Sequence, residues 1–265
     1  MAESGEFATP VTRRSRNPAG SGHLRKDRCF VTRLFKNAML SIALLCSLSL
    51  TFGSVATAAQ SGSDVDIEDV GDLVLDADVD FLLEDLESPI SNSDLPEGFS
   101  DATLIDPDDE DAAAGVLDAS AYAEVVGSVG YSLTGDTKAF GVLNMTVTAQ
   151  ILVLDPEEEA ADYLEVILEG AEDEIAETDL EDTELSAELS SLNGVDTVVI
   201  TLEQTVKRVS VLVHFMIVPV GNSFVITTVT VADRNDVDVD TVAEANQELS
   251  LSIINFLGDT AADAA

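Results

Sequence analysis

Residues 195–232 read VDTVVITLEQTVKRVSVLVHFMIVPVGNSFVITTVTVA, and this stretch decides the fold. Alternate residues of 208–218 are apolar, a period of two that indicates a β-strand with one buried face. The residues on that face are Val209, Val211, Val213, Phe215 and Ile217. The same alternation runs through 195–206, and Gly221-Asn222 marks a tight reversal into a strand over 223–232. Short connections of this kind join antiparallel neighbours, so we expect an antiparallel sheet.

The sequence before this stretch predicts two more strands and a helix. The strands cover 121–133 and 138–154, with turn-forming residues at 134–137 between them. In the helix that follows, Asp155 is suited to the N-cap and Pro156 to the first helical position. Spacings of three and four then place one set of apolar side chains on the inner face. These are Ala160, Leu164, Ile167, Leu168, Ala171 and Ile175. An acidic loop leads from this helix to the strands.

A second helix is predicted near the C-terminus. Thr241 and Glu244 have the spacing of a capping box, which places the start of the helix at Thr241. Its inward residues are Val242, Ala245, Leu249, Ile253 and Phe256. Gly258 is suited to ending the helix, and we expect 259–265 to form a flexible tail. The whole pattern predicts an α+β domain over 95–258, with an antiparallel sheet of about six strands and two main helices packed on it.

Charge is divided sharply along the chain. Residues 1–60 contain eight of the 12 Lys and Arg residues but three of the 51 Asp and Glu residues, which leaves four bases and 48 acids after residue 60. Such a surface repels phosphate backbones and anionic lipid headgroups, so we expect no nucleic-acid partner. Cations or salt should gather at the acidic surface. Two explanations of the charge stay open, namely adaptation to high salt and the solubility of a secreted protein.

The first 58 residues form a basic leader with the three parts of a secretory signal. An uncharged run covers 38–53 (AMLSIALLCSLSLTFG), with Arg33 and Lys36 before it and Ala56-Thr57-Ala58 after it. This order predicts export, cleavage near Ala58 and a secreted or cell-envelope location. The alternative is an uncleaved membrane anchor, because 38–59 reaches the ~20 residues of a spanning helix. Both cysteines lie in this leader, so the mature part has no disulfide or thiolate site.

Residues 59–94 are predicted to form an acidic, disordered linker. They contain 12 acids and no base, with single apolar residues between them, and mutual repulsion should keep such a segment extended. Four acids from Asp76 to Glu87 have the spacing of a calcium-binding loop. Phe81, however, stands where that loop requires glycine for its sharp turn, so we expect no calcium loop here.

The order of elements resembles the Mog1/PsbP-like fold. The features that carry the resemblance are LPEGF at 95–99, DPEEEAADYLEVIL at 155–168, and LNGVDTVVITLEQ at 192–204 running on through FVITTVTV at 224–231. Small exported bacterial proteins and lipoproteins share this outline. The resemblance implies binding or accessory roles more than catalysis. It transfers no functional residue, because no family motif matches residue by residue.

Motifs for catalysis are missing from the mature sequence. His214 is its only histidine, and it lies in the middle of a predicted strand, with no Gly-x-Ser-x-Gly elbow elsewhere in the chain. Neither a Gly-x-x-x-x-Gly-Lys nor a Gly-x-Gly-x-x-Gly loop occurs. Forty-eight acids guarantee coincidental carboxylate pairs, so glycoside hydrolysis stays a minor alternative, although the chain lacks Trp for a sugar platform. We therefore expect no enzyme, no cofactor and no metal site.

The other face of strand 208–218 is the candidate binding surface. It carries Leu212, His214 and Met216, a mixed set rather than a uniformly polar one. Such a face is either covered by the chain itself, with 112–133 as the expected cover, or offered to a partner. The sequence thus predicts an exported, acidic, non-catalytic binding or accessory domain for an unknown protein or small molecule. The alternative is a carrier of a small hydrophobic ligand, which needs an apolar cavity.

Overall fold

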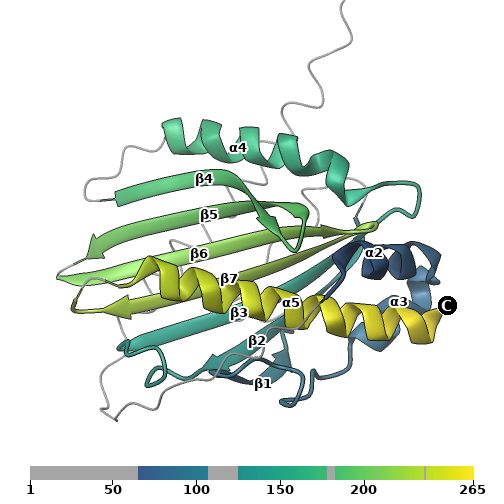
Figure 1. Ribbon diagram of the computed structural model, residues 1–265, viewed down its shortest axis with the longest axis horizontal. Helices are drawn as coiled ribbons and strands as arrows, with labels where there is room; N and C mark the ends of the chain where they lie inside the picture. Colours follow the sequence, from purple (N-terminus) through teal and green to yellow (C-terminus); the bar gives the residue numbers. More distant parts are fainter. Residues whose placement is uncertain (1–64, 107–124, 178–182, 207, 236) are drawn as a thin grey trace, which may run out of the picture.

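The computed structural model describes residues 65–106, 125–177, 183–206, 208–235 and 237–265. Over these ranges the protein is an α+β domain built on one seven-stranded antiparallel sheet (Figure 1). The strands are β1 Phe99–Leu104, β2 Val125–Gly135, β3 Asn144–Leu154, β4 Thr183–Leu192, β5 Val195–Val206, β6 Val209–Val220 and β7 Ser223–Asp233. They lie in the order β1-β2-β3-β7-β6-β5-β4, so β4 to β7 form a meander and β7 pairs with β3.

Helices cover both faces of the sheet. The elements are α2 Ile67–Asp76, α3 Val79–Leu86, the short 3-10 helix η3 Ala160–Tyr163, α4 Leu164–Glu177 and α5 Val239–Ala264. The long helix α5 crosses one face, where it contacts β6 and β7, and α2 and α3 pack beside it (Figure 1). On the opposite face α4 contacts β4 and β5. The sheet is therefore the middle layer of the domain.

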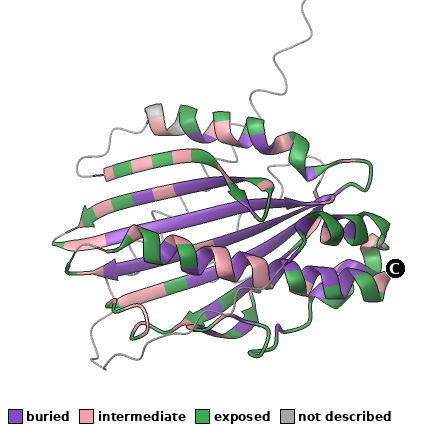
Figure 2. Cartoon of the chain, viewed as in Figure 1, coloured by how far each residue is buried: buried purple, intermediate pink, exposed green. Residues whose placement is uncertain are grey.

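Strand β6 divides the core into two clusters. Val211, Val213, Phe215 and Ile217 point into the cluster under α4, as the alternation in the sequence predicts. Leu212, Met216, Val218 and Val220 point into the cluster under α5, α2 and α3. Both faces of the central strands are thus buried, and in Figure 2 most of β6 and β7 is purple.

The segment 65–94 corrects the expectation of a disordered linker. Asp66 caps α2 by accepting a hydrogen bond from the Asp69 amide at 3.3 Å, and Asp78 caps α3 in the same way. The single apolar residues between the acids have helical spacing, and this spacing puts them on one inner face. Those buried side chains are Ile67, Val74, Leu82 and Leu86. The acids occupy the opposite faces and the caps, so their repulsion does not prevent folding. The rest of the predicted linker and the leader lie outside the described residues.

Glycines let α2 come close to its neighbours. A Cβ on Gly71 would lie 3.0 Å from the Gly221 amide nitrogen, in the turn between β6 and β7. A Cβ on Gly258 would lie 3.1 Å from the methyl groups of Val70. Gly258 therefore lies inside α5 as a contact point, and the prediction that it ends the helix is wrong. The predicted flexible tail is also wrong, because α5 continues to Ala264. The carbonyl oxygen of Ala264 accepts a hydrogen bond from the Asp78 amide at 3.3 Å.

Other boundaries differ from the sequence prediction. The sheet has seven strands rather than about six, because the sequence predicts no strand at β1 and an acidic loop where β4 lies. Helix α4 begins at Leu164, after a turn in which Asp155 accepts a hydrogen bond from the Glu157 amide at 3.0 Å. Helix α5 begins at Val239, and Thr241 donates a hydrogen bond to Asp238 rather than starting the helix.

Candidate functional site

The predicted binding face of β6 is buried. Leu212, His214 and Met216 have exposed fractions of 1%, 3% and 1%. Helix α5 covers them, so of the two alternatives the covered face is confirmed and the exposed surface offered to a partner is wrong. The cover is not the one expected, because 125–133 belongs to strand β2 and 112–124 lies outside the described residues. The physical reason is that a half-apolar strand face in the centre of a sheet is most stable beneath a helix.

A buried polar cluster joins α5 to this face. The Asn246 amide nitrogen donates to His214 Nδ1 at 2.9 Å and to the His214 carbonyl oxygen at 3.0 Å. Beside it, the Thr227 and Ser250 hydroxyls are 2.6 Å apart, and Ser250 donates to the Asn246 carbonyl oxygen at 2.8 Å. The Asn246 side-chain oxygen is buried and has no hydrogen-bond partner in the part of the chain that the structure describes. These contacts fix where α5 lies on the sheet.

The chemistry of His214 suits a structural role. Burial lowers the pKa of His214 to about 4, so the ring is neutral near pH 7. Its Nδ1 accepts from Asn246, which places the ring proton on Nε2. Among the described residues, no carboxylate bonds to the ring, and Ser250 donates to a carbonyl oxygen rather than to the histidine. The cluster therefore has no nucleophile–base pair of the kind that hydrolysis requires.

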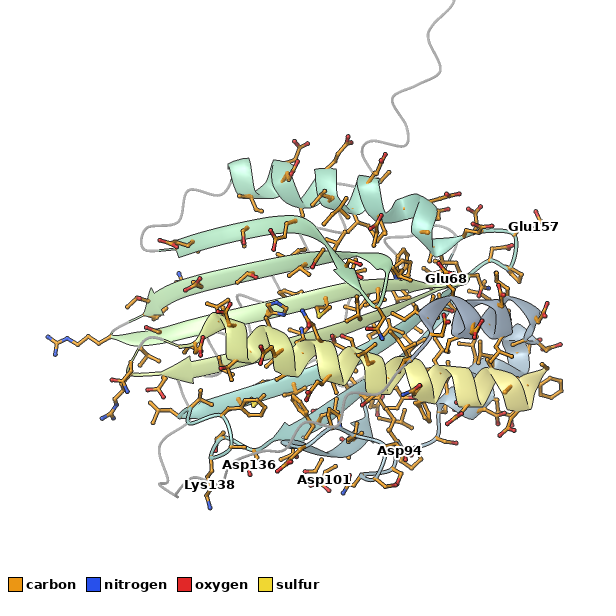
Figure 3. The ribbon with its side chains drawn as sticks, in the orientation of Figure 1. Glu68, Asp94, Asp101, Asp136, Lys138 and Glu157 are labelled. Atoms are coloured by element: carbon orange, nitrogen blue, oxygen red, sulfur yellow. The ribbon has the colours of Figure 1, made fainter. Side chains whose placement is uncertain are left out.

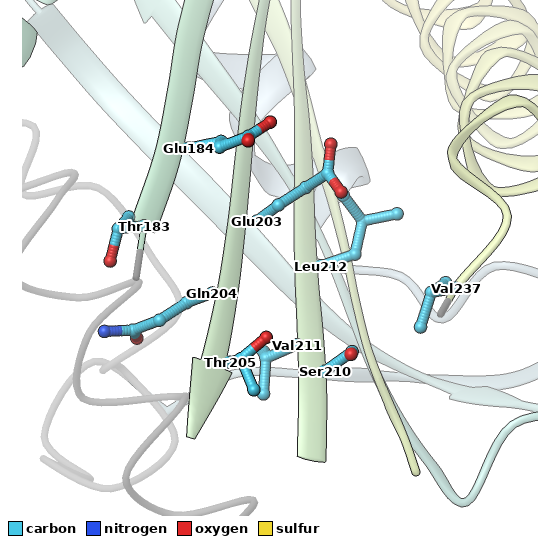
Figure 4. A pocket seen from close by; sticks show the side chains of 9 residues that line it. All are labelled: Thr183, Glu184, Glu203, Gln204, Thr205, Ser210, Val211, Leu212 and Val237. Atoms are coloured by element: carbon cyan, nitrogen blue, oxygen red, sulfur yellow. The ribbon is translucent and has the colours of Figure 1, made fainter. Parts of the chain in front are cut away.

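A large surface hollow lies at the open end of strands β4, β5 and β6. We call it the β4–β6 hollow, and its volume is about 650 Å³. It is lined by Thr183, Glu184, Glu203, Gln204, Thr205, Ser210, Val211, Leu212 and Val237 (Figure 4). Val237 comes from the chain just before α5, so the start of that helix bounds the hollow on one side.

Strand register brings two carboxylates together in the hollow. Glu184 of β4 lies directly opposite Glu203 of β5, and Glu203 lies opposite Leu212 of β6. The three side chains extend to the same side of the sheet in Figure 4. Thr205 and Ser210 form the neighbouring pair on this side. Like charges directly opposite each other on a sheet are unfavourable. Neither glutamate forms an ion pair with any of the residues that the structure describes.

Sequence reasoning missed this pair for a clear reason. Glu184 lies in the segment for which the sequence predicts an acidic loop. Its pairing with Glu203 also depends on the register between β4 and β5. The available signal was the alternation of Leu185, Ala187 and Leu189, which indicates a β-strand at this position. That strand is β4, which lies at the edge of the sheet next to β5. In the parts of the chain that the structure describes, no three His, Cys, Asp or Glu side chains gather at one point. Across the same parts, no helix is long and apolar enough to cross a membrane.

Comparison with known proteins adds little to this geometry. No protein-family model matches the sequence, and no curated protein matches it significantly. Among solved structures, one match is LpqN, described as involved in cell envelope biogenesis of Mycobacterium tuberculosis. It is 12% identical, with 59% of this chain and 77% of LpqN covered and a TM-score of 0.29. A likeness this weak carries no inference about fold or function. The resemblance to the Mog1/PsbP-like fold thus rests on element order alone.

Proposed function

We propose that this protein is an exported, non-catalytic binding or accessory domain that takes a cationic group in the β4–β6 hollow. The observation that carries the proposal is the pair Glu184 and Glu203, which face each other on neighbouring strands without a basic partner among the described residues. Two carboxylates held this way repel each other until a positive charge lies between them. A bound cation converts the unfavourable pair into a favourable site.

The lining of the hollow suits a hard cation or an ammonium group. Glu184 and Glu203 supply carboxylate oxygens, and Thr205 and Ser210 add hydroxyl oxygens on the same side of the sheet. Oxygen ligands of this type are those that Ca²⁺ and Mg²⁺ prefer. The same oxygens accept hydrogen bonds from an alkylammonium group, whose carbon chain would contact Val237 at the edge of the hollow.

The alternatives have less support from the geometry. A carrier of a hydrophobic ligand needs an apolar cavity, whereas this hollow is open and contains two glutamates. A hydrolase acting on sugars would use a carboxylate pair, but no aromatic side chain is among the residues found to line the hollow. Binding without catalysis therefore accounts best for the described site.

Export and the fold family are parts of the same proposal. Export is supported by the apolar run at 38–53, the bases before it and the small residues around Ala58. The mature domain is then secreted or held in the cell envelope. Membership of the Mog1/PsbP-like group is supported by the entry sequence at 95–99 and by the order of strands and helices. An acidic surface outside the cell favours cationic rather than nucleic-acid partners.

Calorimetric titration of the exported protein with CaCl2, MgCl2 and spermidine tests the proposal. We expect saturable binding of at least one of the three, weakened about tenfold by Glu184→Gln/Glu203→Gln, since both glutamates are exposed and each exposed charge pair contributes about 0.2–1 kcal/mol. The matched control is Glu188→Gln, which removes a charge from the same side of β4 but opposite Val199. If the control and the double variant lose affinity by the same factor, the cations are attracted by the overall acidic charge, and a site in the hollow is contradicted.

A further inference from the structure

A second, separate hollow runs along the outer side of α5. We call it the α5 groove, and its volume is about 370 Å³. One wall is the segment 93–96, and the other is α5. The helix residues that line it are Glu248, Leu251, Ser252, Asn255, Phe256 and Asp259. Their spacing of three and four puts them in one stripe, which runs for roughly 16 Å along the helix.

Both walls of the groove are held in place by the fold. Leu95 is buried, and the Asp101 amide donates to the Asn92 side-chain oxygen at 2.7 Å, which fixes the loop that contains the first wall. On the helix, the Phe256 ring lies edge-on to the Tyr131 ring with centroids 6.0 Å apart. Tyr131 is itself fixed, because its hydroxyl donates to the Leu86 carbonyl oxygen. The groove is therefore preformed.

The groove combines an apolar floor with an acidic rim. Leu251 and Phe256 are half-buried and leave apolar surface open to a ligand. Asp94, Glu248 and Asp259 line the groove with them, and Figure 3 labels Asp94 on the side of α5 toward β1 in that view. None of the three carboxylates pairs with a basic side chain in the described part of the chain. The rim therefore has an unbalanced negative charge next to surface that water hydrates poorly.

We propose that the α5 groove docks a basic peptide segment of a partner protein, in which Lys or Arg residues flank up to three apolar side chains. The apolar side chains would lie on Leu251 and Phe256, and the cations would pair with the rim carboxylates. Ser252 and Asn255 lie between these contacts and offer hydrogen bonds to the peptide backbone. A groove of roughly 16 Å matches about five residues of extended chain at ~3.3 Å each.

Charge complementarity selects this occupant over the others. A second copy of the chain would bring its own excess of acids, since four bases oppose 48 acids after residue 60. Nucleic acids and anionic lipids meet the same repulsion. A small polyamine would satisfy the rim but leave the apolar floor exposed. A basic peptide with apolar side chains satisfies both parts of the groove.

The test uses the exported protein and a fluorescent synthetic peptide, KLKKLFKK, with KSKKSSKK as the peptide without apolar side chains. We expect KLKKLFKK to bind at least tenfold more tightly than KSKKSSKK in fluorescence anisotropy at physiological salt. Glu248→Gln/Asp259→Asn should weaken its binding about tenfold, because two ion pairs at the protein surface are lost. Leu251→Ser should weaken it by a smaller factor. Circular dichroism checks that each variant is folded.

Two controls separate the groove from the rest of the acidic surface. Glu165→Gln/Glu169→Gln removes two exposed charges from α4 and should leave peptide binding unchanged. Glu184→Gln/Glu203→Gln should also leave it unchanged, so failure of the β4–β6 hollow and failure of the groove are distinguishable. Equal binding of both peptides, equal loss in the α4 control, or sedimentation showing that a second copy occupies the groove would overturn the proposal.

Discussion

The two faces of the sheet are covered in different ways. On one face α2, α3 and α5 come from the two ends of the domain and form a single core cluster with the sheet. On the other face, among the described elements, η3 and α4 cover the cluster; α4 contacts chiefly β4 and β5, at one edge of the sheet, and its Val166 is 44% exposed. The comparison teaches that the acidic N-terminal segment is part of the main core, whereas α4 is a partial cover over an edge of the sheet.

The largest effect should come from emptying the core under α3. Leu82 and Leu86 are fully buried, and replacing each by Ala costs about 2–5 kcal/mol. The double variant Leu82→Ala/Leu86→Ala should therefore lose most of a stability that is typically about 5–15 kcal/mol. Chemical denaturation monitored by circular dichroism measures the loss. The matched change on the α4 side, Val166→Ala, should cost less than about 0.5 kcal/mol, because that side chain is exposed. Similar midpoints for the two variants would refute the comparison.

A smaller effect should follow from separating α2 from the sheet. Gly221 has φ +59°, and a Cβ there would lie 2.5 Å from the Gly71 carbonyl oxygen. Gly194 also has a positive φ, +93°, but nothing lies within 4 Å of its Cβ position. Ala at either site incurs backbone strain of about 1 kcal/mol, and Gly221→Ala must also displace α2. We expect Gly221→Ala to cost about 3 kcal/mol or more, against about 1 kcal/mol for Gly194→Ala. Equal melting temperatures would show that α2 is not held at this turn.

The mildest test titrates the buried histidine under α5. Burial lowers the pKa of His214 to about 4, from 6.5 in the unfolded chain, so unfolded protein binds more protons between these values. Stability is therefore fully present above about pH 6.5 and is lost as pH falls toward 4. The difference between the two pKa values corresponds to about 3 kcal/mol of unfolding free energy, which is the most that this group loses at low pH. His214→Leu removes this dependence and keeps the backbone carbonyl that Asn246 contacts. The unfolding free energies of the two proteins, measured by denaturation at several pH values from 7 to 4, should approach each other as the pH falls. A difference that stays constant over this range would contradict the prediction.

The strands and helices that could be predicted from the sequence are those whose apolar residues repeat at a regular spacing within the element itself. Alternation in 195–232 predicted β5, β6 and β7 closely, and spacing of three and four predicted α4 and the inner face of α5. Helices α2 and α3 were missed because net charge was weighed above spacing, although Ile67, Gly71 and Val74 lie four and three residues apart. For the side of β6 carrying His214, the alternative of a covered face is confirmed, but the cover is α5 rather than 112–133. Which helix lies on a strand depends on the tertiary arrangement, which one strand's sequence does not contain.

The candidate sites depend on pairing between distant residues. Glu184 and Glu203 are 19 positions apart in a register that sequence alone does not specify. The α5 groove joins 93–96 to residues more than 150 positions later. Neither has a sequence motif, and in a chain with 51 acids a carboxylate pair does not stand out.

The contact between α3 and the last residues of α5 has a consequence for the order of synthesis. Asp78 donates its amide hydrogen to the carbonyl oxygen of Ala264, and α2 packs along the same helix. Helices α2 and α3 are thus stabilised by α5, which is made later, so this core closes only when α5 has left the ribosome. Contacts of such long sequence separation form slowly. A chain that completes its core last stays unfolded through elongation, the state in which a polypeptide passes through a narrow translocation channel.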